Sequence, residues 1–407
     1  MTSPDEGRPS GRARVGTGSL LVRPHEWVTT LATARYAAGV ASSADVARAA
    51  ASVTDHAGLA RHLADEGLEL LFVRAMTESG GFASLGSAAP AFITRSAALA
   101  TRSLAQFRQL ADLVAAFADA GVTALPYKGP LLSWRLYGDA ALRSSTDLDI
   151  VVERDEYERA RAVLVARGLA PRRGHTRAQE RSLFRWLGHA SFGTGDATFV
   201  ELHWRFAPHK FPYALSPRDA IARSRSVQVA GRSLRMMSDL DLVVTLAMHA
   251  TMHVVERLEW LAGFARAFTR IDAPAADLLA HAGRLHGRRM LLVAVATAHA
   301  VLELPLDAAW TTAVAADEAA KRIAALLALD VWQRGSGVPV EREGARLQRL
   351  YADMMDGPLQ AARLLVSGAL LPTEREWEAV RLPDALSPLY LAMRPLRLLT
   401  RVFRRRA

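Results

Sequence analysis

The chain has 407 residues, of which 50% are hydrophobic and 23% are charged. This is the composition of a soluble globular protein and not of a disordered, collagen-like or membrane-spanning chain. A single hydrophobic core rarely extends over so many residues, so two or three domains are expected. The absence of cysteine excludes disulfide frameworks, thiolate nucleophiles and cysteine-based zinc sites, and it favours a cytoplasmic protein.

The net charge of +10 is compatible with an anionic partner such as nucleic acid, a membrane surface or a nucleotide. Only three of the 51 basic residues are lysines, however, and the base composition of a genome can by itself produce such a bias towards arginine. The charge alone therefore makes nucleic-acid binding the less favoured of these interpretations.

The N-terminal quarter of the chain divides into a leader and a helical region. Residues 1–20 are rich in Gly, Ser, Pro and Arg and lack the apolar core of a secretory signal, so we expect a disordered leader. Residues 21–120 have apolar positions three and four apart, which predicts amphipathic helices. Within them, residues 98–120 indicate one long helix that stops at Gly121.

The pattern changes after residue 120 to short β-type runs separated by glycine and polar turns. The expected strands are 122–125, 148–152, 189–192, 198–204, 226–229 and 233–236, and a helix is expected at 155–167. Strands mixed with helices predict an α/β or α+β domain over residues 121–237. We favour the α+β class, with a small mixed sheet between two helical regions.

The back half of the chain is expected to be helical. Residues 238–388 regain helical periodicity, and their apolar stretch 290–302 is too short to cross a bilayer, so no transmembrane segment is expected. Residues 389–407 form a basic tail in which arginines alternate with apolar residues. Such a tail could contact a membrane surface. We prefer a basic helix packed on its own protein with a frayed end, because Pro395 interrupts the pattern.

The segment most informative about chemistry is 125–152, which reads LPYKGPLLSWRLYGDAALRSSTDLDIVV. It predicts a short strand, a glycine turn, a helix, a polar loop and a second strand. Asp147 and Asp149 are two apart on the second strand, so their side chains point the same way. Adjacent like charges are costly without a cation, and Mg²⁺ binds carboxylate oxygens together with substrate phosphates. The alternative is a solvent-facing pair at the start of a strand.

The glycine turn before this helix has the features of a phosphate site. A helix N-terminus reached through Gly129 presents free backbone N–H groups to a phosphate, and Pro130 suits the first helical turn. Lys128 can add a positive charge, and Arg143 could hold a phosphate oxygen through two N–H groups. Lys128 and Arg143 could instead simply neutralise the aspartates.

A third carboxylate, Glu201, lies inside the expected strand 198–204. If that strand pairs beside the strand of the aspartates, Glu201 faces the same metal ions, and two cations can stabilise the entering and leaving oxygens of an in-line displacement. Glu201, or a hydroxide bound to a metal near it, would deprotonate the acceptor hydroxyl. The alternative is a salt bridge to an arginine. His203 faces the same side and could assist proton transfer or bind phosphates, whereas Trp204 faces the core.

Two histidines, His249 and His253, are four apart on an expected helix, with Glu256 one turn further on. That spacing can bind a metal. Because no third ligand is evident, we expect structural hydrogen bonds or contact with the nucleotide in preference to zinc.

Together these residues resemble the uncharacterised nucleotidyltransferase family of the polymerase-beta-like superfamily. The resemblance extends over residues 25 to 400 and is carried by Lys128, Gly129, LYGD at 136–139, Arg143, Asp147, Asp149, ELHW at 201–204, His249 to His253, 257–261, Arg394 and Pro395. It implies a polymerase-beta-like catalytic domain that moves a nucleoside monophosphate from a nucleoside triphosphate, with ATP expected and Mg²⁺ as cofactor, to an acceptor.

The chain departs from the family pattern at two positions. Superfamily members commonly carry Gly-Ser where this chain has Gly129 and Pro130, so Ser133 is the candidate to replace the missing hydroxyl. Gly263 stands where an acidic residue is expected after Leu261.

The resemblance does not identify the acceptor. We expect a hydroxyl, phosphate or similar group on a small molecule, peptide or protein. Two alternatives stay open. One is a nucleotide-binding regulator or catalytically degenerate homologue, and the other is an enzyme that adds nucleotides to an RNA or DNA end.

Overall fold

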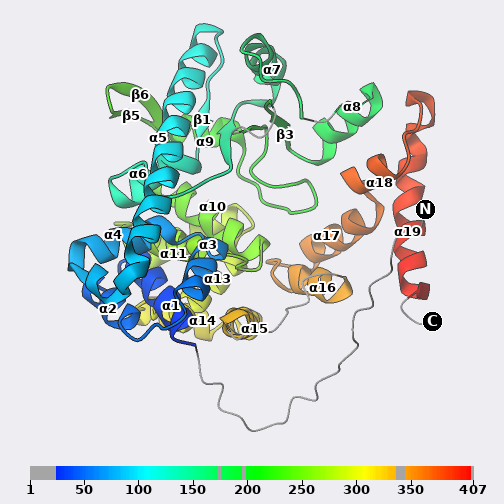
Figure 1. Cartoon of the computed structure of the whole chain (residues 1–407). Helices are drawn as coiled ribbons and strands as arrows, with labels where there is room; N and C mark the ends of the chain where they lie inside the picture. The colour runs from blue at the N-terminus through cyan, green and yellow to red at the C-terminus, as the bar shows by residue number, and fades with distance from the viewer. Residues whose placement is uncertain (1–23, 173, 175, 195–198, 336–343, 405–407) are drawn as a thin grey trace, which may run out of the picture.

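The computed structural model describes residues 24–172, 174, 176–194, 199–335 and 344–404 (Figure 1). The leader expected at residues 1–20 lies outside these ranges. In the described part of the chain helices come first, strands and helices follow between residues 125 and 236, and helices occupy the remainder. This is the expected α+β fold, a small mixed sheet flanked by helical regions. None of the helices in these ranges combines the length and apolar character that crossing a membrane requires.

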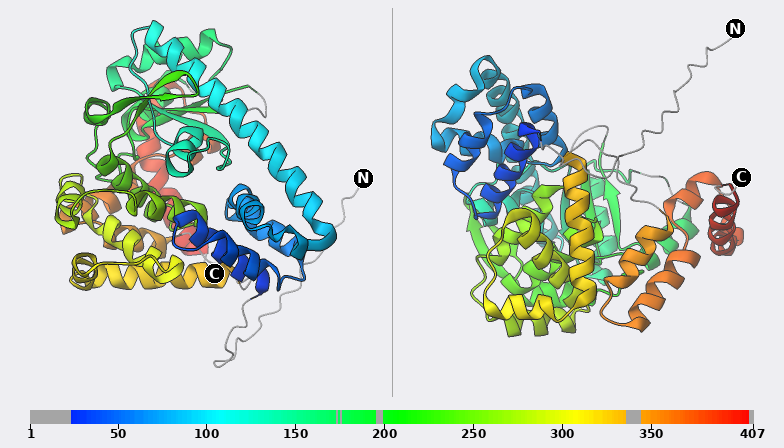
Figure 2. Two further views of the ribbon diagram at one scale, coloured as in Figure 1. Left: turned by 90° about the vertical axis from the view of Figure 1, so that its left-hand side faces the viewer. Right: turned by 90° about the horizontal axis from the view of Figure 1, so that it is seen from below.

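The N-terminal region is built from helices. They are α1 (His25–Ala38), α2 (Ser43–Ala50), α3 (His56–Asp65), α4 (Glu69–Ser79), η1 (Gly81–Ala88) and α5 (Ala89–Asp119). The last is the long helix that the sequence predicts, but it begins earlier, because Pro90 is tolerated in its first turn. It ends just before Gly121, which has a positive φ of 68°. Figure 2 shows α5 (cyan) running from the N-terminal helices to the sheet.

The central sheet has the strand order β1-β2-β4-β3. Its strands are β1 (Leu125–Pro126), β2 (Asp147–Val151), β3 (His189–Phe192) and β4 (Phe199–His203). The β2 and β4 strands are parallel and the other pairs are antiparallel. A separate hairpin consists of β5 (Arg225–Val229) and β6 (Arg232–Met236). Each strand overlaps the run that predicted it, although β1 is much shorter than 122–125 and Thr198 lies outside the described residues.

Short helices connect the strands. They are α6 (Gly129–Tyr137), η2 (Arg154–Glu156), α7 (Tyr157–Ala166), α8 (Arg177–Trp186) and α9 (Pro217–Arg223). The helix expected at 155–167 is thus η2 continued by α7. The remaining helices are α10 (Asp239–Met252), α11 (Leu258–Phe268), α12 (Ala275–Arg284), α13 (Arg288–Leu302), α14 (Ala308–Ala315), α15 (Glu318–Gly335), α16 (Ala345–Asp353), α17 (Pro358–Leu370), α18 (Glu374–Ala379), η3 (Asp384–Leu389) and α19 (Tyr390–Arg404).

Two hydrophobic cores hold these elements together. The larger one lies among the helices and contains the apolar stretch 290–302 of α13 as well as Trp27 of α1. The smaller one covers one face of the sheet, where Leu148 and Ile150 of β2 pack with Trp204. Because strand side chains alternate, this packing turns the side chains of Asp147 and Asp149 to the opposite face.

The basic tail forms the helix α19, and Pro395, which was expected to interrupt its pattern, lies inside this helix. The α19 helix continues through Pro395 to Arg404, although a proline cannot donate the backbone hydrogen bond of its position. Arg394 donates to the backbone carbonyl of Gly368 at 2.6 Å, and Arg397 pairs with Glu376 of α18. The first half of the tail therefore packs on its own protein, as preferred from the sequence.

A buried carboxylate, Glu66, connects three helices of the larger core. It accepts hydrogen bonds from Nε and Nη2 of Arg334 on α15 at 3.0 and 3.1 Å, and from the backbone N–H of Leu258 at 2.7 Å. Its backbone carbonyl accepts from the N–H of Glu259 at 3.2 Å. Glu66 thus fixes the start of α11, the helix that carries Glu259 towards the sheet.

Replacing Glu66 by alanine should lower the free energy of unfolding by about 3 to 5 kcal/mol, because it leaves the mostly buried Arg334 without its counter-ion. The control is Glu318→Ala, which removes an exposed pair with Lys321 and should cost less than about 1 kcal/mol. Chemical denaturation measures both. Equal effects of the two variants would contradict the role assigned to Glu66.

Candidate active site

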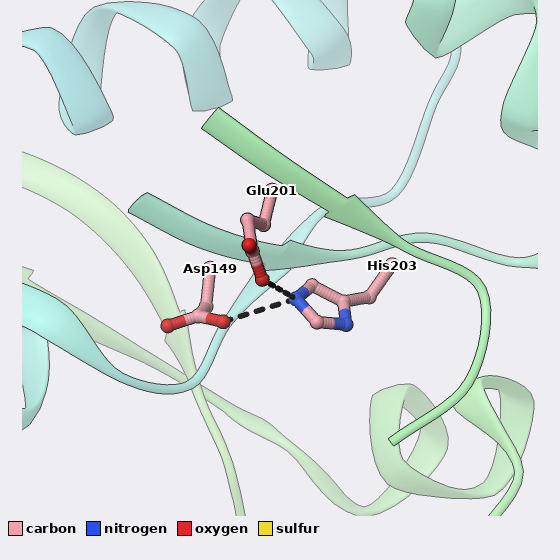
Figure 3. A group of neighbouring side chains, drawn as sticks. All are labelled: Asp149, Glu201 and His203. Carbon is pink, nitrogen blue, oxygen red and sulfur yellow. Dashed lines mark hydrogen bonds and ion pairs between the residues drawn. The ribbon is translucent and has the colours of Figure 1, made fainter. Parts of the chain in front are cut away.

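The pairing of β2 with β4 brings the candidate residues together. Asp149 lies opposite Glu201 and Val151 opposite His203 in this parallel pair. Residues in register, and residues two apart, share a face of a sheet. Asp147, Asp149, Glu201 and His203 therefore lie on the face that the sheet core leaves open, and Figure 3 shows three of them pointing toward one another.

Asp149 lies at the centre of this group, with only 4% of its side chain exposed. Its Oδ1 is 3.0 Å from Nε2 of His203 and 3.4 Å from Nζ of Lys128. The same His203 nitrogen is 3.3 Å from Oε2 of Glu201 (Figure 3). One ligand atom each from Asp149, Glu201 and His203 can lie within 4.8 Å of one another, so these residues could hold a metal ion together.

The glycine turn lies against the start of the aspartate strand. The α6 helix begins at Gly129, whose φ is +62°, a conformation that favours glycine. A Cβ at this position would lie 3.6 Å from the backbone oxygen of Asp147 and 3.7 Å from Oγ of Ser145. The turn therefore places the free N–H groups of the first turn of α6 beside Asp147, in the arrangement expected of a phosphate site.

The sequence also matches the model of a known protein family. A model of an uncharacterised nucleotidyltransferase family matches residues 52–303, more than half of the chain, and includes every candidate residue named above. The chain belongs to this family. It is a nucleotidyltransferase. The matched range is shorter than the 25 to 400 expected from the sequence.

One solved structure is weakly similar to this chain. The antibiotic-resistance factor ANT(2'')-Ia, studied in solution for its substrate-regulated conformational dynamics, is a solved structure that is similar to 46% of this chain, over 94% of its own length. The identity is 13% and the TM-score 0.33. No curated protein matches the chain.

The charges of this nucleotidyltransferase are unevenly compensated. Burial and the neighbouring charges of Asp149 and Glu201 raise the pKa of Asp147 to about 7. Burial also opposes ionisation of Asp149, but Lys128 and His203 outweigh it and hold the pKa of Asp149 below its usual range. Although burial disfavours the imidazolium, hydrogen bonds to Asp149 and Glu201 raise the pKa of His203 to about 9. The site thus has more carboxylate charge than Lys128 and His203 neutralise, and its oxygen donors fit a divalent cation.

Ser133 does not lie with the carboxylates. It is fully buried in α6, and its hydroxyl donates to the backbone carbonyl of Asp139 at 2.7 Å. A different hydroxyl, that of Ser145, lies beside the Gly129 turn and donates to the backbone carbonyl of Asp147 at 3.0 Å. Its position two residues before Asp147 is the signal by which the sequence could have indicated it.

Arg143 is engaged by a partner that the sequence did not indicate. Its guanidinium forms an ion pair with Glu259 of α11, and both side chains are largely buried. Burial alone would lower the pKa of Arg143, but Glu259 and the more distant Asp149 raise it. A Cβ on Gly263 would lie 4.0 Å from Oε1 of Glu259. An acidic group, that of Glu259, thus lies beside Gly263, one helical turn before the position where one was expected from the sequence.

Two further residues of the site were missed. The buried Tyr127 packs its ring edge-on against His203, with 5.5 Å between centroids, and burial together with the charge of Asp149 raises its pKa well above the usual value. His189 of β3 has its Nε2 3.9 Å from Oε2 of Glu201, and burial lowers its pKa to about 4, so it is neutral. Only the strand register places His189 opposite His203.

His249 and His253 form a ring cluster with Trp260. The centroids are 4.7 Å apart between the histidines, and 4.8 and 5.1 Å from each to Trp260. Burial lowers the pKa of His253 to about 4 and holds that of His249 well below its usual value, so both rings are neutral. The charges of Lys128 and Asp149 shift the pKa of His249, so the cluster lies within electrostatic range of the carboxylates. The group of possible metal ligands found among the described residues does not include either histidine.

Asp147→Asn should stabilise the metal-free protein above neutral pH. The folded state raises the pKa of Asp147 from 3.8 to about 7, so ionising this carboxyl destabilises the fold. The penalty grows as the pH rises between these two values and is constant above them. Thermal denaturation should therefore show similar melting temperatures for variant and wild type near pH 4, and a higher one for the variant at pH 8.

Asp149→Asn is the matched control for this experiment. Ionised Asp149 is stabilised by Lys128 and His203, so the amide should lower the melting temperature at pH 8. A loss of stability in both variants would contradict the charge distribution described here.

Proposed function

We propose that this nucleotidyltransferase moves a nucleoside monophosphate from a nucleoside triphosphate, with ATP the expected one, to a hydroxyl, phosphate or similar acceptor on a small molecule, peptide or protein. The observation that carries the proposal is the placement of Asp147, Asp149 and Glu201 on one sheet face beside the Lys128 and Gly129 turn. Mg²⁺ held by the three carboxylates would stabilise the entering and leaving oxygens of the displacement. The cysteine-free composition keeps the cytoplasm as the proposed location.

Each side chain has a role that follows from its position. The N–H groups at the start of α6 and the ammonium of Lys128 would bind the triphosphate. Hydrogen bonds from His203 help hold the pKa of Glu201 below its usual value despite burial. Glu201 is therefore ionised and able to accept a proton. The neutral rings of His249, His253 and Trp260 offer flat faces on which a nucleobase can stack.

The proposed reaction is a single displacement. The acceptor oxygen forms a bond to the α-phosphorus, the bond between this phosphorus and the bridging oxygen of pyrophosphate breaks, and the acceptor proton moves to Glu201. The products are the nucleotidylated acceptor and pyrophosphate. Arg143 acts indirectly in this scheme, because its guanidinium is paired with Glu259 and anchors the loop before Asp147 to α11.

Titration of the purified protein with ATP, GTP, CTP and UTP, with and without Mg²⁺, tests the proposal. At least one triphosphate should bind the wild type only when Mg²⁺ is present. The Asp147→Ala, Asp149→Ala double variant should bind this triphosphate about tenfold or more weakly, because each substitution removes a charged contact to the metal.

Asp155→Ala provides the control for this titration. Asp155 lies in η2 with 75% of its side chain exposed and should be neutral to binding. Equal binding by wild type and double variant would overturn the metal site. Absence of Mg²⁺-dependent binding by the wild type would favour the degenerate homologue.

A further inference from the structure

A cavity of about 800 Å³ opens next to Glu201. It lies between β3, α7 and α8, and its wall includes His189, Ser191, Phe199 and Glu201. Ser191 is opposite Glu201 and His189 opposite His203 in the β3–β4 pair, while Phe199 is opposite Asp147. These residues open the cavity to the sheet face that carries the carboxylates. From there it extends around the edge strand β3, because its wall also includes Phe192, Tyr157 and Leu183, which pack on the opposite face.

The position of the cavity identifies which reactant it would hold. The order β1-β2-β4-β3 places the Lys128 and Gly129 turn at one edge of the sheet and the cavity at the other, with the carboxylates between them. In an in-line displacement the leaving pyrophosphate and the attacking oxygen lie on opposite sides of the phosphorus. If the triphosphate occupies the turn, the cavity lies on the side of the acceptor, with the proposed base Glu201 at its entrance.

The charge of the walls indicates the chemistry of that acceptor. Arginines contribute most of it, and they are Arg161, Arg172, Arg177 and Arg181. The acidic wall residues besides Glu201 are Glu158 and Glu180, which Arg161 contacts at 3.5 and 3.6 Å. Guanidinium groups bind phosphate and carboxylate through paired N–H groups. With four arginines against the three carboxylates of Glu158, Glu180 and Glu201, the wall favours an anionic acceptor over a polycation.

Contacts with other elements hold Arg172 and the helix that carries Arg181. The backbone N–H of Arg172 donates to the carbonyl of Ser191 at 2.9 Å, and its guanidinium lies 4.5 Å from the centroid of the Phe199 ring. Arg181 is on α8, the helix whose second residue, Ala178, donates its N–H to the carboxylate of Asp384 at 3.1 Å. Gln179, also on α8, donates to the hydroxyl of Tyr390 at 3.0 Å. The C-terminal segment thus positions the arginine-bearing wall.

We propose that this cavity is the acceptor site and that the acceptor is a small hydroxyl compound with a phosphate or carboxylate group, of the sugar phosphate or sugar acid class. The proposal rests on the proposed function. The hydroxyl oxygen of the acceptor forms the new bond to the α-phosphorus, pyrophosphate leaves, and the proton goes to Glu201. The anionic group of the acceptor binds the arginines at the other end of the cavity.

The test measures pyrophosphate release from the triphosphate that binds with Mg²⁺, in the presence of paired acceptors. The pairs are glucose with glucose 6-phosphate, glucose with glucuronate, ribose with ribose 5-phosphate, and glycerol with glycerol 3-phosphate. In at least one pair the anionic member should increase release by about tenfold or more over the neutral one, the effect of one or two charge-assisted hydrogen bonds. Comparison of the phosphate compounds with glucuronate shows whether the site binds a phosphate or a carboxylate group.

Substitutions in the cavity wall test whether its arginines cause the preference for an anionic acceptor. The Arg172→Ala, Arg181→Ala double variant should raise the KM for the anionic acceptor by about tenfold or more and leave binding of the triphosphate unchanged. Arg185→Ala, on the same helix but outside the cavity wall, is the control and should change neither.

Two results would overturn the acceptor assignment. One is a rate that no anionic compound increases over its neutral partner, and the other is a double variant that behaves like Arg185→Ala. In both cases the wild type would still bind the triphosphate in the presence of Mg²⁺. If the proposed function itself were wrong, the wild type would not show this binding.

Discussion

The pairing of β2 with β4 in parallel register is the constraint on which the rest of the site depends. It concentrates three carboxylates on one face of the sheet, where burial and mutual repulsion make full ionisation costly. Lys128 and His203 compensate part of this charge at Asp149, and Asp147 keeps a pKa of about 7. A divalent cation would relieve this repulsion, which is why the proposed function places Mg²⁺ between the carboxylates and the phosphates of the triphosphate.

Contacts from the helical regions position residues on this face of the sheet. Glu66 fixes the start of α11, and α11 presents Glu259 to Arg143 in the loop before Asp147. The same helix contributes Trp260 to the ring cluster. On the far side of the sheet, the C-terminal segment holds α8 and with it one wall of the arginine-lined cavity. The side of the Lys128 and Gly129 turn and the side of the cavity are thus supported by different parts of the chain.

Sequence patterns were sufficient for the features that depend on local spacing. The alternation of Asp147, Leu148 and Asp149 predicts which side chains share a face, and the Gly129 and Pro130 pair predicts a helix start. Features that depend on contacts between distant segments could not be predicted in this way. The Arg143 and Glu259 pair joins residues 116 positions apart, and His189 reaches the site only through the register of β3 with β4. Ser133 illustrates the same limit, because its spacing suited a phosphate contact while its hydroxyl bonds inside the fold.

The identity of the bond that breaks in the triphosphate tests the central claim most directly. The triphosphate, labelled at its α-phosphorus, would be incubated with Mg²⁺ and with wild-type protein or Glu201→Gln. The account predicts that the wild type produces pyrophosphate and a labelled monophosphate, free or attached to an acceptor, and that Glu201→Gln produces neither at a comparable rate. Formation of a labelled nucleoside diphosphate and inorganic phosphate, or a rate unchanged in Glu201→Gln, would contradict it.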